Sequence, residues 1–90
     1  MDPKILIVSP VWLGDGIGES RFAEFFDGKT AVENSKRLAF WYEEAARLFD
    51  CEFFDAATVA HAGSVDCLHL EKESHETLAQ ALAQKVRTII

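Results

Sequence analysis

The sequence predicts an α/β fold with a parallel sheet, because two short apolar strands flank one long amphipathic helix. The first strand is expected over residues 4–9, the helix over 30–49 and the second strand over 51–55. A strand, a crossover helix and a second strand form a unit that is right-handed in nearly all proteins and requires parallel strands. The pattern therefore indicates part of a three-layer α/β/α sandwich.

The first apolar run, Lys4–Ser9, is continuous rather than alternating and is stopped by Pro10. Continuous apolarity is typical of a strand covered on both faces, as in the middle of a parallel sheet. Pro10 has no amide hydrogen to donate, so the strand ends there. Such a strand needs more neighbours than one further strand supplies. We therefore expect residues 1–90 to form a single, incomplete domain, either a fragment or a half that completes its sheet with another chain.

A long irregular segment, residues 11–29, follows the first strand and contains three glycines within Gly14–Gly18. α/β proteins build binding sites at this position, beyond the carboxyl ends of parallel strands. The glycines do not complete the dinucleotide-binding fingerprint, because Glu19 stands where its last glycine is required. We interpret the segment as a flexible loop with one short helical turn within residues 21–26.

Aromatic side chains in this segment are candidates for substrate contact. Trp12 follows the strand end and is the candidate substrate-binding residue. Together with Phe22, Phe25 and Phe26 it could line a pocket for an acyl group. The alternative is that these rings pack as a small hydrophobic cluster under the loop.

The central helix is expected over residues 30–49. Thr30 and Glu33 have the spacing of a capping box, in which each side chain binds a backbone amide at the helix start. Apolar residues recur at helical spacing and form a wide face, typical of a helix that lies on a sheet. That face comprises Leu38, Trp41, Tyr42, Ala45, Ala46, Leu48 and Phe49.

The second half of the chain predicts one more strand and one more helix. Residues 51–55 form the strand, residues 56–64 a loop of small residues, and residues 72–88 the last helix. This helix also has an apolar face at helical spacing. Its members are Leu78, Leu82, Val86 and Ile89.

An acid and an imidazole, Asp66 and His69, stand three residues apart just before the last helix. Asp66 is placed to accept a hydrogen bond from one ring nitrogen of His69, which leaves the other nitrogen as a general base. This arrangement supplies two members of a Ser-His-Asp triad. Neither Ser20 nor Ser64 lies on a strand-to-helix elbow that would present a nucleophile. Cys67 is expected to point away from the pair in a tight turn and to pack as a small apolar residue.

Composition narrows the range of partners and compartments. Nine basic and fifteen acidic side chains give a net charge of −6, which disfavours nucleic acid and anionic membranes as partners. No apolar run reaches the ~18 residues of a membrane span, and the N-terminus does not match a signal peptide. Two cysteines without CxxC spacing fit a reduced, cytoplasmic protein.

A metal site would have to draw on His61, Cys67, His69 and His75, together with Asp66. Their spacing matches no metal-binding motif such as CxxC or HExxH, so no metal is expected. No organic cofactor is implied either. We interpret His61 as a solvated loop residue and His75 as a residue of the helix surface or a brace for the loop.

The order of these features resembles the C-terminal part of the SGNH (GDSL-type) hydrolases, closest to their small esterase and acyltransferase branch. The most specific piece is Asp66–Leu70, followed by Ser74-His75 and Leu78-Ala79. It resembles the family's last block, in which Asp and His lie three apart ahead of the final helix. The family usually has Gly where Ser74 stands. The resemblance extends over essentially all ninety residues and implies a flavodoxin-like sandwich.

By this resemblance the chain would be part of a serine esterase or acyltransferase for small esters, with His69 as the base and Asp66 as its orienting acid. The family's nucleophile lies in a Gly-Asp-Ser motif, and its oxyanion Gly and Asn lie in two further upstream blocks that this sequence lacks. Gly14-Asp15-Gly16 resembles that motif only superficially, and Asn34 lies within the predicted helix. We therefore expect the chain alone to be inactive.

The alternative hypothesis is a truncated, inactive domain that acts only by self-association or by pairing with a partner. An exposed sheet edge would favour such pairing, either between two copies of the chain or with the missing N-terminal half. Only the first hypothesis gives ester hydrolysis once the domain is complete.

Overall fold

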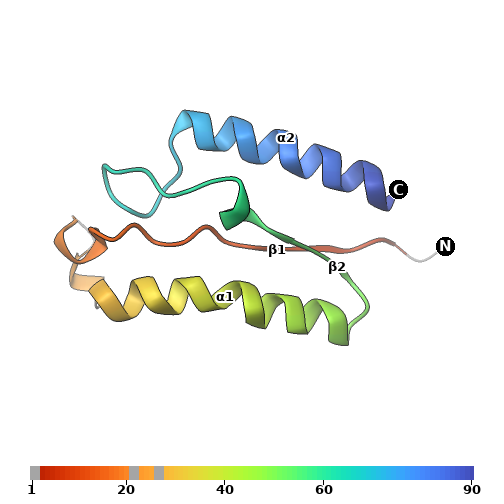
Figure 1. Ribbon diagram of the computed structural model, residues 1–90, viewed down its shortest axis with the longest axis horizontal. Helices are drawn as coiled ribbons and strands as arrows, with labels where there is room; N and C mark the ends of the chain where they lie inside the picture. Colours follow the sequence, from red (N-terminus) through yellow and green to blue (C-terminus); the bar gives the residue numbers. More distant parts are fainter. Residues whose placement is uncertain (1–2, 21–22, 26–27) are drawn as a thin grey trace.

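The computed structural model describes residues 3–20, 23–25 and 28–90. In this part of the chain a two-stranded sheet lies between two long helices, α1 on one face and α2 on the other (Figure 1). The predicted α/β class is therefore confirmed. The elements in chain order are β1 (Leu6–Ser9), α1 (Gly28–Leu48), β2 (Glu52–Asp55) and α2 (Lys72–Ile89), with short 3-10 helices at Ile17–Glu19, Ala23–Phe25 and Ala56–Thr58.

The two strands pair in parallel, in a register that runs from Leu6 opposite Glu52 to Ser9 opposite Asp55. The predicted strand, crossover helix and second strand are all present. At the carboxyl end of the sheet the buried hydroxyl of Ser9 donates to Oδ1 of Asp55 over 3.0 Å. The same oxygen accepts from the amide of Ala57 at 2.9 Å. These bonds fix the point at which β1 and β2 end and the loops that follow them begin.

The start of α1 differs from the prediction. The helix begins at Gly28, two residues earlier than expected, and Thr30 and Glu33 are exposed within it. Because Gly28 and Lys29 are already helical, Thr30 lies inside the first turn and is not the N-cap residue. The predicted capping box is therefore wrong.

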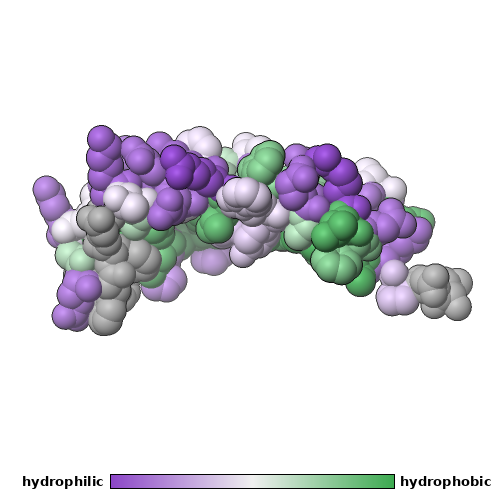
Figure 2. All heavy atoms as spheres, turned by 90° about the horizontal axis from the view of Figure 1, so that it is seen from below, coloured by the Kyte–Doolittle hydropathy of each residue, from purple (hydrophilic) through white to green (hydrophobic). Residues whose placement is uncertain are grey.

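The wide apolar face of α1 is only partly covered by the sheet. Val32, Ser35 and Ala46 are buried, whereas Trp41 is 62% exposed and Leu48 is 78% exposed. Figure 2 shows hydrophobic side chains gathered near the C-terminal end of α1, on a face that is otherwise largely hydrophilic. The prediction that the whole face lies on the sheet is wrong, because a two-stranded sheet is too narrow to contact both halves of it.

The molecule is a thin slab, 48 × 28 × 17 Å, with a radius of gyration of 14.6 Å. A compact domain of this length has a radius of gyration of about 12 Å. Among the described residues the buried hydrophobic side chains are few and mostly small. They are Ile17, Val32, Ala46, Ala56 and Ala60.

The last helix, α2, covers the face of the sheet opposite α1 (Figure 1). Its observed bounds, Lys72–Ile89, agree with the prediction to within one residue. Within the described ranges, no helix has the length and apolarity that a membrane crossing requires.

Candidate active site

The loop that precedes α2 is closed at its base by backbone hydrogen bonds. Ala62 and Leu70 form an antiparallel bridge, and the amide of Gly63 donates to the carbonyl of His69 over 2.8 Å. Inside the loop the amide of Cys67 donates to the carbonyl of Gly63 at 3.0 Å. The acid and the imidazole identified from the sequence therefore lie in a short loop that its own backbone closes.

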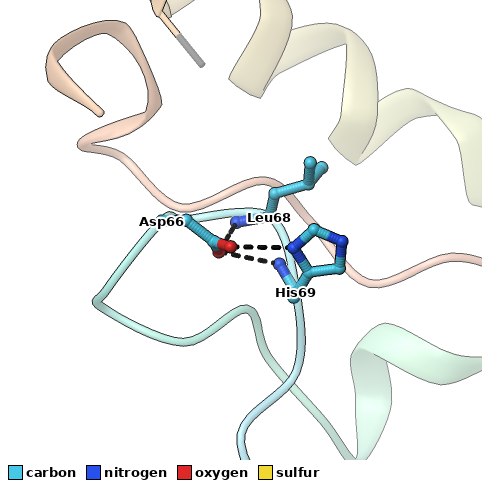
Figure 3. A network of polar contacts seen from close by, with 3 residues as sticks. All are labelled: Asp66, Leu68 and His69. Carbon is cyan, nitrogen blue, oxygen red and sulfur yellow. Dashed lines mark hydrogen bonds and ion pairs between the residues drawn. The ribbon is translucent and has the colours of Figure 1, made fainter. Parts of the chain in front are cut away.

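Asp66 and His69 are in direct contact in this loop (Figure 3). Nδ1 of His69 lies 2.7 Å from Oδ2 of Asp66. The other carboxylate oxygen, Oδ1, accepts from the amides of Leu68 and His69, each at 2.9 Å. Both oxygens of Asp66 are thus engaged, one by the side chain and one by the backbone of the same loop.

The two members of the pair differ sharply in exposure. The Asp66 side chain is 10% exposed and the His69 side chain 68% exposed. The hydrogen bond from the His69 ring, followed by those from the amides of His69 and Leu68, holds the pKa of Asp66 well below its usual range. Asp66 is therefore an ionised acceptor fixed to the protein, and the imidazole that it orients faces outward.

This geometry assigns different tasks to the two ring nitrogens of His69. Because an ionised Asp66 accepts at Nδ1, that nitrogen carries a hydrogen, and Nε2 is the nitrogen with a lone pair. An imidazole in this tautomer can take a proton at Nε2 while the carboxylate stabilises the resulting imidazolium. The arrangement is chemically competent for general-base catalysis.

Comparison of the folded chain with solved structures identifies esterases. A carbohydrate acetylesterase family member from Sinorhizobium meliloti is 34% identical, with a TM-score of 0.82; the match covers 98% of this chain and 40% of that chain. The aryl esterase of M. smegmatis is 31% identical, with the same TM-score and coverage. A structure from Agrobacterium tumefaciens strain C58 is 39% identical, with a TM-score of 0.76 and the same coverage.

The chain matches the C-terminal part of the SGNH hydrolases. The resemblance read from the sequence is therefore confirmed. The chain spans about 40% of the length of these solved SGNH esterases. No protein-family model and no curated protein matches it.

Trp12 is 46% exposed and lines a pocket of about 360 Å³ together with His61 and residues 57–60. The ammonium group of Lys36 lies 5.1 Å from the centre of its ring. Leu68, the neighbour of His69, lines a different pocket of about 430 Å³. Trp12 and Leu68 therefore face separate cavities, and a substrate contact by Trp12 stays a prediction.

The other aromatic candidates for the acyl pocket are not placed by the structure. Phe22 and Phe26 lie outside the described residues, as does the side chain of Phe25. The pocket that Leu68 lines is formed mainly by aliphatic side chains. They come from the segment after β1, the first half of α1 and the loop that carries Asp66 and His69. These residues include Pro10, Val11, Leu13, Leu38 and Leu68.

The remaining histidines are distributed along the surface. His61 and His75 are both exposed, and Nδ1 of His61 lies 3.2 Å from the carbonyl oxygen of Ala62. Within the described ranges no three His, Cys, Asp or Glu side chains form a group that could hold a metal ion. Ser74, at the family's Gly position, is buried in the first turn of α2, and its hydroxyl accepts from the amide of His61 at 3.4 Å.

Two contacts that hold the loop of Asp66 and His69 in place were not predicted from the sequence. The amide of Leu68 binds Asp66, and the Gly14 segment contacts Cys67, which is half-buried in the predicted tight turn. The Gly-Asp-Gly run after β1 was the available signal, because closely spaced glycines allow a backbone to approach another segment. The structure shows this part of the loop anchored by hydrogen bonds and by the fully buried Ile17.

We expect the lowered pKa of Asp66 to make folding stability depend on pH in the acid range. A carboxyl whose pKa is depressed by folding contributes stability above the usual value of 3.8, and this contribution is lost as the pH falls toward its folded pKa. Urea unfolding between pH 6 and pH 2 should therefore show a smaller loss of stability in Asp66→Asn than in the wild type. Glu76→Gln, at an exposed site on α2, is the matched control. Identical pH profiles for the wild type and Asp66→Asn would contradict the expectation.

Proposed function

We propose that this chain is a fragment of an SGNH-type serine esterase that carries the acid and the base of the triad. In this proposal Asp66 is the orienting acid, His69 is the general base, and the nucleophilic serine and oxyanion donors come from the N-terminal part of the domain. The observation that carries it is the 2.7 Å contact between Nδ1 of His69 and Oδ2 of Asp66. The esterase names of the solved relatives support the same reaction class.

The proposed reaction proceeds in two steps through an acyl-enzyme. Nε2 of His69 takes the proton of the serine hydroxyl as the serine oxygen attacks the ester carbonyl, and it returns the proton to the departing alcohol. Water then attacks the acyl group while His69 takes its proton, and His69 returns that proton to the serine oxygen as the acyl–serine bond breaks and the carboxylic acid leaves. Asp66 stabilises the imidazolium in both steps. Small acetyl and aryl esters are the proposed substrates, because the S. meliloti and M. smegmatis relatives are named for them.

The open side of the slab offers a place for the rest of the domain. In the described part β1 pairs with β2 on one edge, and the uncovered stripe of α1 around Trp41 is exposed. A right-handed unit added before β1 would put its strand beside the other edge of β1 and its helix in the layer of α1. That placement would cover the features that the two-stranded sheet leaves open.

The test is a chimera in which these ninety residues replace the matching C-terminal part of the S. meliloti acetylesterase. We expect the chimera to hydrolyse p-nitrophenyl acetate and the ninety-residue chain alone to give no acceleration over buffer. His69→Ala in the chimera should abolish the activity, whereas His75→Ala, at an exposed position on α2, should leave it intact. A folded but inactive chimera would count against the enzyme. Activity of the chain alone that disappears in His69→Ala would show that the nucleophile is not missing.

A further inference from the structure

Cys67 has an unusual backbone conformation. It lies between Asp66 and the two residues whose amides bind the Asp66 carboxylate. Its φ of 61° lies in the left-handed region, which residues other than glycine adopt rarely. The chain reverses there, so that the amides of Leu68 and His69 both point at Oδ1 of Asp66. The conformation of Cys67 therefore determines where the carboxylate and the imidazole meet.

Both backbone polar groups of Cys67 are held by hydrogen bonds. Its amide donates to Gly63 at 3.0 Å, within the loop, and its carbonyl accepts from the amide of Gly14 at 2.8 Å. Gly14 belongs to the segment after β1, far away in the sequence. Its own carbonyl accepts from the amide of Ile17 at 3.0 Å, and Ile17 is fully buried. The second bond thus joins the loop to an anchored segment.

The contact between Gly14 and Cys67 leaves no room for a side chain at position 14. A Cβ there would lie 2.8 Å from Cβ of Cys67 and 3.1 Å from its Cα and Sγ. Separations this short force one segment to move, and the nearest atoms are not the far end of a flexible side chain. At Gly16 a Cβ would lie 3.2 Å from the same sulfur. The two glycines form a surface against which Cys67 fits.

We infer that Gly14 is a positioning residue for the Asp66–His69 pair and that it acts through Cys67. It fixes the left-handed turn by one hydrogen bond to the Cys67 carbonyl and by close contact with its side chain. Displacement of Cys67 moves the Leu68 and His69 amides off Oδ1 and disturbs the bond between Oδ2 and the ring. The inference rests on the proposed function for its catalytic meaning, but the hydrogen bond itself is measurable without any activity.

The experiment follows the ring nitrogens of His69 by ¹H–¹⁵N NMR in the ninety-residue chain, whose three histidines are assigned with His61 and His75 variants. We expect the wild type to show one tautomer, protonated at Nδ1. Gly14→Ala should lose this signature and give a mixture of tautomers. Cys67→Gly in the Gly14→Ala background removes the Cβ at 2.8 Å and the Sγ, and leaves only the 3.1 Å approach to Cα, which a small shift relieves. Glycine also suits a φ of 61°, so the double variant should regain the wild-type signature. Gly18→Ala is the matched control outside this contact.

The outcomes separate the inference from its alternatives. An unchanged tautomer in Gly14→Ala would overturn it, and so would a double variant that stays altered. If Gly14→Ala fails to fold by circular dichroism, a folded double variant with the wild-type signature supports the inference, and an unfolded double variant overturns it. The ester hydrolysis of the chimera tests the proposed function separately, because its failure leaves the NMR result standing.

Discussion

Asp66→Asn in the chimera should lower kcat for p-nitrophenyl acetate by about 10³–10⁴-fold, with little change in KM. An amide at position 66 can present its NH₂ group to Nδ1, which favours the tautomer with hydrogen on Nε2. In that tautomer His69 cannot accept the serine proton. Asp66 also binds the Leu68 and His69 amides at 2.9 Å, and Asn keeps one oxygen to accept from them, so the loop should remain folded.

The matched control is Glu76→Gln, which removes one carboxylate from an exposed position on α2. Its kcat should stay within about twofold of the parent chimera, because it touches no part of the histidine loop. A rise in KM at unchanged kcat in Asp66→Asn would mean that Asp66 contributes to substrate binding instead. Stopped-flow and steady-state measurements of p-nitrophenol release distinguish the two results.

Ile17→Ala should lower the free energy of unfolding of the chain by about 2–5 kcal/mol. Ile17 is fully buried, with 0% of its surface accessible to solvent. Few other large side chains are buried among the described residues. Truncation removes buried apolar contacts and leaves a cavity under the segment that carries Gly14. Because a small domain has only a narrow margin of stability, the loss should be obvious in urea unfolding.

Ile90→Ala is the matched control, because Ile90 is the same residue type with 89% of its surface exposed. Its unfolding midpoint should be close to that of the wild type. Equal midpoints for Ile17→Ala and Ile90→Ala would show that the segment after β1 does not contribute to the core. A lowered midpoint with an unchanged denaturant slope is the expected form of the result.

The features that depend on neighbours in the sequence were predictable. The Asp66–His69 contact needs only a three-residue spacing and a tight turn. The parallel pairing of the strands follows from a crossover helix between two apolar runs. The start of α1 was misplaced because capping depends on whether Gly28 and Lys29 join the helix, which Thr30 and Glu33 do not reveal.

The features that depend on distant parts of the chain were not predictable. A wide apolar stripe does not tell which half of it meets the sheet, so the exposure of Trp41 and Leu48 appears only in the folded chain. The Gly14–Cys67 contact joins segments on either side of α1 and β2. Trp12 follows β1, as expected, but it lines a pocket with residues 57–61 and is not among the residues that line the pocket beside Leu68.

The hydrogen bonds that Asp66 accepts from the Leu68 and His69 amides and from the His69 ring join residues two or three positions apart. Closing so short a loop costs little chain entropy. The Gly14 segment that contacts Cys67 also lies within these ninety residues, so the acid and the base assemble within this part of the chain. An SGNH domain divided upstream of β1 would thus keep its proton-transfer group intact in one piece. Recovery of activity would then require only that the two pieces of the domain bind each other. Its rate would rise with the concentration of the missing piece.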